Sequence, residues 1–376
     1  MTDYSGLLLA STAEIRSVAK QLIQPDDARC NPEIFLASIY KGWKPRVVAV
    51  YNASELVGVM YAKERVIAGV STGVVYADGS VIDIMFGDPN HRERAFGAAV
   101  ETLLASSRIR GVRFRLQRGS AELAAIKSLV ASKPLDARYS RIKHQSSPIW
   151  KYDAFLALPE TYDQFLAQLG GTTRHNFRYY RRRFEKAGHR LLLNLSMEEL
   201  RCAADYLADK SKFAAEAPPT QGEIEGMLKM VAAAGRPLAM GLKHQSGEWL
   251  SVVAGWYRPQ GAVLLTQFNH DRNYSRDSLA VVLRAYLIEI LISQGLKELV
   301  IWADTGPPLS RYVSYRPAIS VHLDRPAYAW RVARFLISNM RPCMPKRLAR
   351  AAQWIAPVLL GAVYTQIANT TAIALS

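Results

Sequence analysis

Cysteine is scarce in this sequence. The three cysteines, Cys30, Cys202 and Cys343, lie far apart and have no paired spacing. They offer neither a disulfide framework nor a cysteine-based zinc site, and we expect them to be buried as small apolar side chains. The first residues also lack the cationic start and the long apolar core of a secretion signal. These absences predict a chain that stays in the reducing cytoplasm.

Acidic residues are also few. The 376-residue chain has 32 Asp and Glu against 48 Lys and Arg, which gives a net charge of +16. An excess of this size favours phosphate-rich partners such as nucleotides, RNA or an anionic membrane surface. The length suits two domains, and the hydrophobic fraction of 49% is that of a chain that folds into packed domains.

Several motifs of enzyme chemistry are absent as well. The sequence contains no phosphate-cradling loop of the P-loop type, no nucleophile elbow and no cluster of residues with metal-ligand spacing. These absences argue against P-loop nucleotide chemistry and against a serine hydrolase of the elbow type. We expect no metal cofactor.

A strongly basic segment, GGTTRHNFRYYRRRFEKAGH, runs from Gly170 to His189. Phe177, Tyr180 and Phe184 recur in it at three- and four-residue steps, which predicts an α-helix with one apolar stripe. Gly188 stands where a left-handed C-terminal cap belongs. The segment therefore predicts an amphipathic helix with a basic flank.

The charges of this helix favour an anionic ligand. Thr172 or Thr173 is the expected cap of its first turn. The basic face of a lone helix of this kind is more often simply exposed to solvent. However, the consecutive cations from Arg181 to Arg183 repel one another unless an anion or an acidic surface binds them. Arginine also suits phosphate, because its planar fork donates two parallel hydrogen bonds. The residues that we expect to bind a substrate are Arg174, Asn176, Arg178 and Arg182.

The rest of the chain predicts the order strand, strand, strand, helix, strand twice. The first half predicts capped helices over 11–24 and from 31, strands at 46–51, 56–66, 74–86 and 112–116, and a helix over 88–107. The second half predicts strands at 150–158, 191–195, 237–243, 250–258, 263–269 and 298–303, and helices from 161, 196 and 220 and over 279–293. A repeated unit fixes architecture better than any single element does.

This repeated order carries a resemblance. Three antiparallel strands, a helix and a fifth strand resemble the core of the GNAT acyltransferase fold, and two copies in one chain resemble the FemAB-like enzymes. The segment from Arg174 to Arg183 is similar to the arginine-rich signature of the BioF2-like or CelD-like acetyltransferase group. The resemblance implies an α/β (α+β) protein with two tandem GNAT-like domains, each a mixed, mostly antiparallel sheet flanked by helices. We expect these domains at 1–148 and 149–326, followed by a helical tail at 327–376.

The resemblance also implies a chemistry. GNAT enzymes transfer an acyl group from acyl-CoA to an amine or hydroxyl, so we expect acetyl-CoA or another acyl-CoA as co-substrate. The acceptor would be a small molecule or a glycan, as in polysaccharide or cell-envelope biosynthesis. Two alternatives stay open. FemAB-like relatives can use aminoacyl-tRNA as donor, and a nonenzymatic RNA-binding protein would also suit a helix that interleaves aromatic and basic residues.

Family turns indicate candidate site residues. Asp304 to Gly306 is similar to the turn that follows the fifth strand, and Ser275 to Ser278 stands where GNAT enzymes receive the cofactor pyrophosphate on the N–H groups of a helix start. Asp277 would repel phosphate there unless its side chain caps the helix. The expected catalytic residues are Asp304, His270 and Tyr312, and the expected CoA-binding residues are Arg272, Arg276 and Ser278.

The chain ends in an uncharged stretch, Gln353 to Ser376. Its length would suit a membrane span, but polar residues such as Gln366 and Asn369 make it only moderately apolar. We expect a helix packed on the second domain. The cations that precede the stretch leave peripheral contact with the inner face of the membrane as the alternative.

Overall fold

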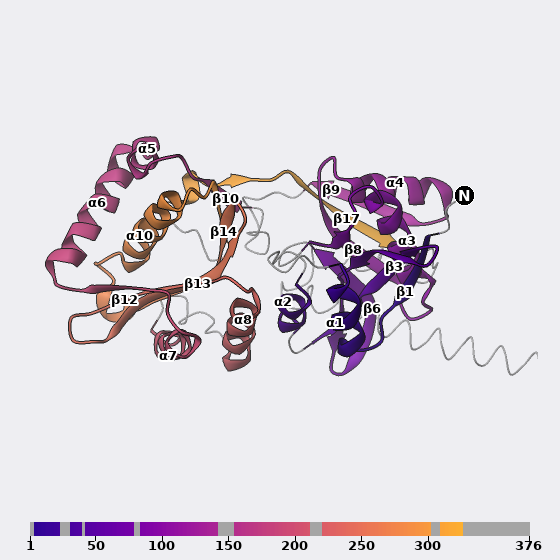
Figure 1. Cartoon of the computed structure of the whole chain (residues 1–376), viewed down its shortest axis with the longest axis horizontal. Coiled ribbons are helices and arrows are strands. Elements are labelled where there is room, and N and C mark those ends of the chain that lie inside the picture. The colour runs from indigo at the N-terminus through magenta and orange to yellow at the C-terminus, as the bar shows by residue number, and fades with distance from the viewer. Residues whose placement is uncertain are drawn as a thin grey trace, which may run out of the picture.

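The computed structural model describes residues 4–22, 31–39, 42–78, 83–141, 154–210, 220–301 and 309–325. Two halves of the chain lie side by side along the long axis (Figure 1). Each half contains antiparallel strands, a helix and one pair of parallel strands. The predicted α/β class with two tandem GNAT-like units is therefore confirmed.

The first half contains two sheets, one of four strands in the order β1-β3-β4-β7 and one of six in the order β2-β5-β6-β8-β17-β9. The four-stranded sheet consists of β1 (Tyr4–Leu8), β3 (Val48–Asn52), β4 (Glu55–Met60) and β7 (Met85–Gly87). The six-stranded sheet consists of β2 (Trp43–Pro45), β5 (Lys63–Ile67), β6 (Val70–Asp78), β8 (Gly111–Gln117), β9 (Asp136–Arg141) and β17 (Ala318–Asp324). The single strand predicted at 56–66 is two strands, because the chain changes sheets between β4 and β5.

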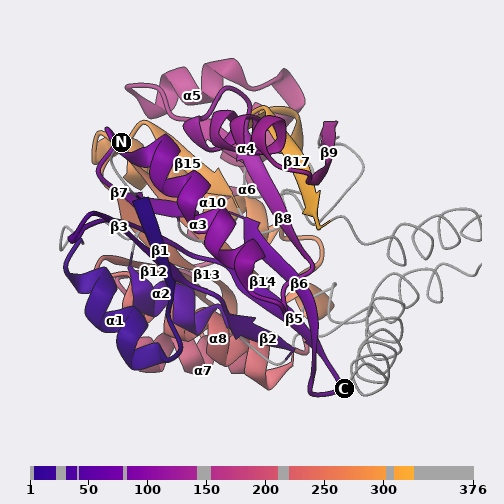
Figure 2. The ribbon, with the colours of Figure 1, turned by 90° about the vertical axis from the view of Figure 1, so that its right-hand side faces the viewer.

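Four described helices accompany these sheets: α1 (Thr12–Lys20), α2 (Pro32–Ala37), α3 (Arg92–Ala105) and α4 (Ala121–Ser132). Ser11 and Glu14 form the capping box that the sequence predicted for α1. The helix α4 was not predicted, although Ser120 caps it by accepting the N–H of Leu123. Buried side chains of α3 and α4 share one core with the sheets, and Figure 2 shows the two helices side by side.

The second half has a seven-stranded sheet in the order β11-β12-β13-β14-β15-β10-β16. Its strands are β10 (Ala154–Ala157), β11 (Arg190–Leu193), β12 (Pro237–Lys243), β13 (Trp249–Arg258), β14 (Gly261–Asn269), β15 (Glu298–Ile301) and β16 (Ser314–Tyr315). All neighbours in this sheet are antiparallel except β14 and β15, which are parallel. A parallel pair needs a crossover, and here the long helix supplies it.

Helices cover both faces of this sheet. They are α5 (Tyr162–Gln168), α6 (Gly171–Lys186), α7 (Met197–Leu207), α8 (Gln221–Ala233), α9 (Asp271–Tyr274) and α10 (Leu279–Ser293). The helices α5, α6 and α10 share one core, and α7 and α8 share another on the opposite face (Figure 1). The predicted capping boxes of α7 and α8 are present, and α10 has the predicted bounds.

The strand β14 carries a β-bulge that shapes its second part. Ala254 pairs with Thr266 while Gly255 pairs with Leu264, so Leu265 is the extra residue. A Cβ at Gly255 would lie 1.8 Å from the carbonyl oxygen of Val263, so the close approach requires glycine. A bulge bends its strand and re-aims the side chains that follow it. The end of β14 is therefore turned relative to its start.

The halves are joined by a shared core, by a hydrogen bond and by the strand β17. One hydrophobic core contains buried residues of α1, α2 and β3 together with residues of α7, α8 and β13. Asn31 Nδ2 also donates to the carbonyl oxygen of Ala233 at 2.7 Å. The strand β17 lies inside the range predicted for the second domain, 149–326, yet it pairs with β8 and β9. The chain thus returns to the first half after completing the second, whereas the predicted tail at 327–376 lies outside the described residues.

Two local predictions were wrong. The N-cap of α6 is Gly170, and neither Thr172 nor Thr173 caps it with a side chain. Cys202 is exposed on α7, where the helix turns this position toward solvent, while Cys30 and Cys343 lie outside the described residues. The left-handed Gly188 after α6 is confirmed, with φ of 69°.

Within the part of the chain that the structure describes, no helix has the length and apolar character needed to cross a membrane.

Candidate functional site

The candidate site lies at the end of β14, beyond its described pairing with the parallel neighbour β15. The two strands pair from Gly261 with Glu298 to Leu264 with Ile301. The strand β14 continues to Asn269, so residues 265–269 have no partner on that side among the described residues. Open α/β sheets bind ligands beyond the carboxyl ends of their strands, where neighbouring strands part.

The helix α10 begins at this edge with an open N-terminus. Ser278, the residue before it, is left-handed with φ of 48° and its side chain makes no capping bond. The N–H groups of Leu279 and Ala280 donate to no acceptor among the described residues, and the first turn contains no acidic side chain. Free N–H groups and the helix dipole together favour an anion at this position.

Asp277 does not act as the cap of α10. Its carboxylate forms an ion pair with Arg183 of α6, with Nη2 and Oδ1 2.9 Å apart. The repulsion that the sequence predicted for a phosphate is therefore offset by a cation at the same point. This pair also fastens the C-terminal end of α6 beside the start of α10.

Four hydrogen-bonded polar side chains lie beneath the start of α10, and we call them the polar floor: Ser251, Gln267, Asn269 and Arg284. Arg284 Nε donates to Gln267 Oε1 at 2.8 Å, and Gln267 Nε2 donates to Asn269 Oδ1 at 3.1 Å. The Ser251 hydroxyl lies 2.7 Å from the same Asn269 oxygen. Gln267 Nε2 also lies 3.5 Å from the carbonyl oxygen of Ala280, in the first turn of α10. Three of these side chains are buried, so the network is set into the core beneath the helix start.

A second polar cluster gathers around Glu248, in the turn before β13. The hydroxyls of Tyr206 and Tyr274 donate to its carboxylate at 2.5 and 2.9 Å, and His270 Nε2 lies 3.2 Å from Oε1. The hydrogen bond from Tyr206 lowers the pKa of Glu248 and raises the pKa of Tyr206 to about 12, while burial raises the pKa of Tyr274. The cluster ties α7, α9 and the end of β14 together.

The predicted catalytic residues lie in different places. His270 is buried in the Glu248 cluster, and its Nδ1 has no hydrogen-bond partner. Tyr312 lies at the start of α6, where its hydroxyl accepts the N–H of Gly170 at 2.7 Å and a hydrogen bond from Thr173 lowers its pKa. The contacts of His270 and Tyr312 do not bring them together. Asp304 lies outside the described residues.

The predicted CoA-binding residues flank the start of α10. Arg272 Nη2 donates to the carbonyl oxygen of Asp209 at 3.3 Å, so part of its guanidinium is used at the end of α7. Arg276 is exposed and makes no hydrogen bond or ion pair with the described residues. Ser278 is half-buried at the entrance to the helix. Arg276 and Ser278 therefore remain available beside the open amides.

The arginines of α6 divide into an inner and an outer set. Arg181 pairs with Glu185 at 3.0 Å and with Glu289 at 2.7 Å, and its guanidinium lies 4.3 Å from the ring centroid of Tyr286. Arg174 Nη2 donates to the carbonyl oxygen of Leu169 at 3.0 Å, at the end of α5. Carboxylates and carbonyl oxygens of this chain thus bind the inner guanidinium groups. These contacts offset the repulsion between neighbouring arginines.

The outer set faces away from α10. Phe177 and Phe184 are buried, and the helical repeat places Arg178, Arg182 and Lys186 on the opposite side. Arg178 and Arg182 form no hydrogen bond or ion pair with the described residues. The exposed rings of His175 and Tyr179 stack beside them, with centroids 5.7 Å apart and planes 16° apart. The described lining of a surface hollow of about 810 Å³ comes entirely from α6. Asn176 is half-buried between the two sides.

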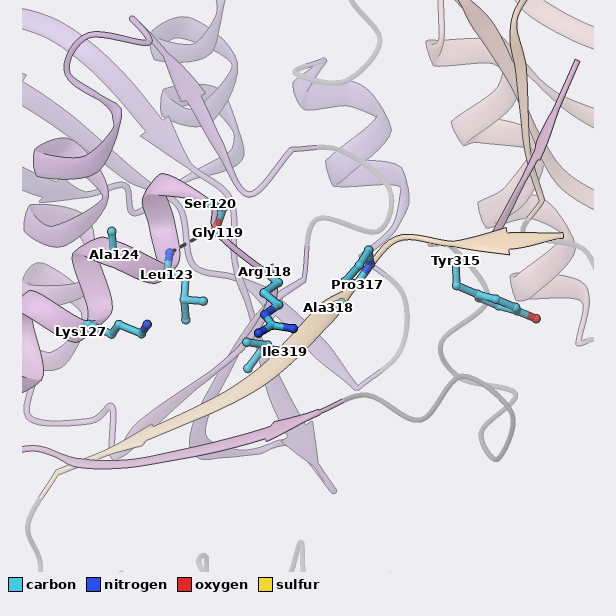
Figure 3. Close-up of a pocket in the computed structure, with 10 residues that line it drawn as sticks. All are labelled: Arg118, Gly119, Ser120, Leu123, Ala124, Lys127, Tyr315, Pro317, Ala318 and Ile319. Atoms are coloured by element: carbon cyan, nitrogen blue, oxygen red, sulfur yellow. Dashed lines mark hydrogen bonds between the residues drawn. The ribbon is translucent and has the colours of Figure 1, made fainter.

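The first half has two hollows of its own. One of about 380 Å³ lies near the starts of α3 and α4, where Arg92 Nε contacts Glu122 Oε1 at 2.5 Å. Another of about 790 Å³ lies where β17 enters the first half (Figure 3). Figure 3 shows Arg118 beside β17 and Lys127 on α4, whereas Tyr315 points away from them. The charged groups that line these hollows include the exposed Arg118 and Lys127, the buried Arg115 and the Arg92–Glu122 pair.

The sequence did not indicate Asn269, Gln267, Arg284 or Glu248. From sequence alone, an asparagine at the end of a strand is expected to be an ordinary turn residue. An arginine inside an apolar helix is expected to be exposed. Their arrangement depends on the register around the bulge and on contacts between separate elements. Among the described residues, no three His, Cys, Asp or Glu side chains are placed to hold a metal ion.

Comparison with solved structures shows the fold. The chain is similar to FemX, with a TM-score of 0.55 and 12% identity, over 84% of this chain and 96% of that one. It is also similar to a C-terminal domain, DUF2156, named for a lysylphosphatidylglycerol synthetase of Agrobacterium fabrum, with a TM-score of 0.52 and 12% identity, over 84% and 93% of the chains. A tandem GNAT protein from the clavulanic acid biosynthesis pathway matches with a TM-score of 0.44 and 11% identity, over 86% and 100%.

No protein-family model and no curated protein matches the sequence. The fold is nevertheless that of the FemAB-like, tandem GNAT group, as the repeated order of elements predicted.

Proposed function

We propose that this protein is an acyltransferase that takes an acyl group from acyl-CoA and transfers it to an amine or hydroxyl acceptor. The observation that carries the proposal is the uncapped start of α10 beside the part of β14 that follows its described pairing with β15. The N–H groups of Leu279 and Ala280 there have no acceptor among the described residues, and the first turn contains no acid. This arrangement suits the pyrophosphate of a bound CoA.

The site residues predicted from the sequence receive proposed roles. Arg276 and Arg272 would contact the phosphates from the loop before α10, and Ser278 would lie against them. His270 and Asp304 are the proposed proton acceptors for the attacking amine or hydroxyl, and Tyr312 the proposed donor to the leaving thiolate. The reaction needs no covalent intermediate with the enzyme, because the acceptor can attack the thioester directly.

The test uses full-length protein with acetyl-CoA. Calorimetry measures binding, and thiol release measures transfer to a panel of amines, amino sugars and peptides. We expect saturable binding of acetyl-CoA and acceptor-dependent release of CoA. A well-folded protein that binds no acyl-CoA would remove CoA as donor.

An aminoacyl-tRNA donor is the second proposal, and the outer face of α6 favours it. The exposed Arg178, Arg182 and Lys186 stand beside the stacked rings of His175 and Tyr179. Cations can contact phosphates while aromatic rings take unpaired bases. The FemAB-like resemblance implies such a donor. Because a nucleic acid contact releases many counterions, tRNA binding should weaken steeply with salt, whereas binding of one CoA should weaken less.

Binding of RNA without transfer is what the nonenzymatic alternative predicts. An assay with charged tRNA separates the two, because only an enzyme would move the aminoacyl group to an acceptor. Substitution of Arg178 and Arg182 should lower tRNA affinity in both cases.

Placement at the membrane is the alternative to the packed helix that the sequence predicts for the tail. The tail at 327–376 would bring a cytoplasmic enzyme to the inner face of the membrane, where acceptors of envelope or polysaccharide biosynthesis are found. Flotation with anionic vesicles, for the full chain and for a chain ending at Arg350, measures this contact. Equal flotation of both chains would remove the tail as the membrane contact.

A further inference from the structure

We infer that Asn269 donates a hydrogen bond from its side-chain amide to the carbonyl oxygen of the bound acyl donor, and that Arg284 and Gln267 set the orientation of this amide. The inference rests on the proposed acyl transfer and adds a catalytic residue and two positioning residues to it. The observation behind it is the polar floor beneath the start of α10.

The direction of each hydrogen bond in this floor follows from Arg284. A guanidinium has only donors, so the atom of Gln267 that it contacts at 2.8 Å must be the amide oxygen. The nitrogen of Gln267 must then be the atom that faces Asn269, at 3.1 Å, and this contact requires the oxygen of Asn269. Ser251 approaches the same oxygen at 2.7 Å. Neither amide can flip without losing these bonds.

Asn269 is left with one unused group. Its oxygen is held from two sides, while its Nδ2 forms no hydrogen bond with the described residues. The side chain is 8% exposed, and Nδ2 is not among the buried atoms that lack a partner, so this nitrogen keeps access to solvent. A fixed amide donor that is nearly buried and has no partner is a binding group for an oxygen.

The position of this donor matches the reacting end of an acyl donor. Asn269 is the last residue of β14, beyond the described pairing with β15, and Gln267 contacts Ala280 in the first turn of α10. A donor whose phosphates lie on Leu279 and Ala280 would therefore run past this floor. Asn269 lies on the face of the sheet that α10 covers, as its contacts with Ser251 and Gln267 show.

The chemical step then balances as follows. The acceptor nitrogen or oxygen forms a bond to the carbonyl carbon, and the carbonyl oxygen gains the negative charge that the Asn269 amide stabilises. The C–S bond then breaks, the carbonyl re-forms, and the proton of the acceptor ends on the released thiol. Removing one donor of this kind lowers kcat by roughly 100- to 1000-fold in well-studied acyl transfer.

Three variants test the roles by kinetics. Asn269→Asp keeps the shape but removes the amide donor, and we expect kcat to fall by about 100-fold with the KM for acetyl-CoA unchanged. Gln267→Glu keeps the bond to Arg284 but loses the donor to Asn269, and we expect a fall in kcat of about tenfold. Thr266→Ser, on the other face of β14, is the control and should change neither constant. Equal kcat in Asn269→Asp and the parent protein would overturn the inference.

Nuclear magnetic resonance on the full chain separates this inference from the proposed function. Acetyl-CoA should shift the side-chain amide signal of Asn269 together with the backbone signals of Leu279 and Ala280, whereas CoA should shift only the backbone signals. Backbone shifts without any response of Asn269 to acetyl-CoA would overturn the inference and leave the CoA site standing. Absence of shifts with both ligands would overturn the proposed donor and this inference together.

Discussion

The two halves each contain a parallel strand pair crossed by a helix, but the two helices start differently. In the first half, α3 begins with Arg92, which contacts Glu122, and has Glu93 in its first turn. In the second half, α10 has no acid in its first turn, and nearby Asp277 is paired with Arg183. Neither helix has a side-chain cap at its N-terminus. An acid in the first turn satisfies a helix start that an anionic ligand would otherwise occupy.

This difference indicates a division of labour between the halves. Carboxylates of the first half face inward and hold arginines, as Glu64 does for Arg46 and Asp324 for Arg113. In the second half, the first turn of α10 has no acid, and the side-chain nitrogen of Asn269 makes no hydrogen bond with the described residues. One copy of the unit would thus stabilise the protein, and the other would bind the donor.

The largest effect should come from breaking the ion pair that anchors β17. Asp324 is 1% exposed and lies 2.6 Å from Arg113. Its replacement by alanine leaves the nearly buried Arg113 guanidinium without this carboxylate and with backbone carbonyl oxygens as its hydrogen-bond partners, which should lower the free energy of unfolding by about 3 kcal/mol. Urea unfolding measures this. Glu101→Ala, which breaks an exposed pair with Lys133, is the control and should cost less than about 0.5 kcal/mol.

Substitutions can exchange the charge in the first turn between α3 and α10. Ala280→Glu gives α10 an acid in its first turn, as α3 has, so the helix itself should gain stability while the affinity for acetyl-CoA falls about tenfold, or ~1.4 kcal/mol. Glu93→Ala makes α3 resemble α10. Calorimetry should show unchanged affinity for this second variant. Weaker binding in Glu93→Ala than in Ala280→Glu would place the donor site in the first half.

The Glu248 cluster should make the second half sensitive to acid. The hydrogen bond from Tyr206 holds the folded-state pKa of Glu248 below its ordinary value, so this carboxylate adds stability above its unfolded pKa of about 4.3 and loses it as the pH falls through the folded pKa. Glu248→Gln should therefore be less stable than the parent at pH 7, and the difference should shrink at pH 3. A difference independent of pH would assign the effect to packing alone.

The smallest effect should come from the outer face of α6. Arg178 and Arg182 are exposed and unpaired among the described residues, so replacing either with alanine should change the free energy of unfolding by less than about 0.5 kcal/mol. Arg181→Ala, on the inner face, is the matched comparison and should cost more because it leaves Glu289 alone. Unfolding of Arg178→Ala or Arg182→Ala would mark these residues as structural.

Much of the fold was predictable because its signals are local. The capping boxes at Ser11, Ser196 and Thr220 predicted three helix starts, and the bounds of α10 followed from an apolar run that ends at Gly295. The return of β17 to the first half was not predictable, because strand order in a sheet depends on pairing between distant segments. The helix α4 was missed although Ser120 marks its start.

The site was less predictable than the fold. Exposed amides at the start of α10 were an expectation from the family resemblance, but the partner of Asp277 lies on another helix and cannot be predicted from the turn itself. The roles of Gln267 and Asn269 depend on the bulge at Leu265 and on a buried arginine from α10. Pairing of Arg181 with Glu289 likewise depends on how two helices pack.

The structure of the full chain with acetyl-CoA tests the central claim most directly. We expect the pyrophosphate on the N–H groups of Leu279 and Ala280, and the acyl oxygen within hydrogen-bond distance of Asn269 Nδ2. Acetyl-CoA bound instead at the start of α3, in the hollow beside Arg92 and Glu122, would contradict the assignment of donor binding to the second half.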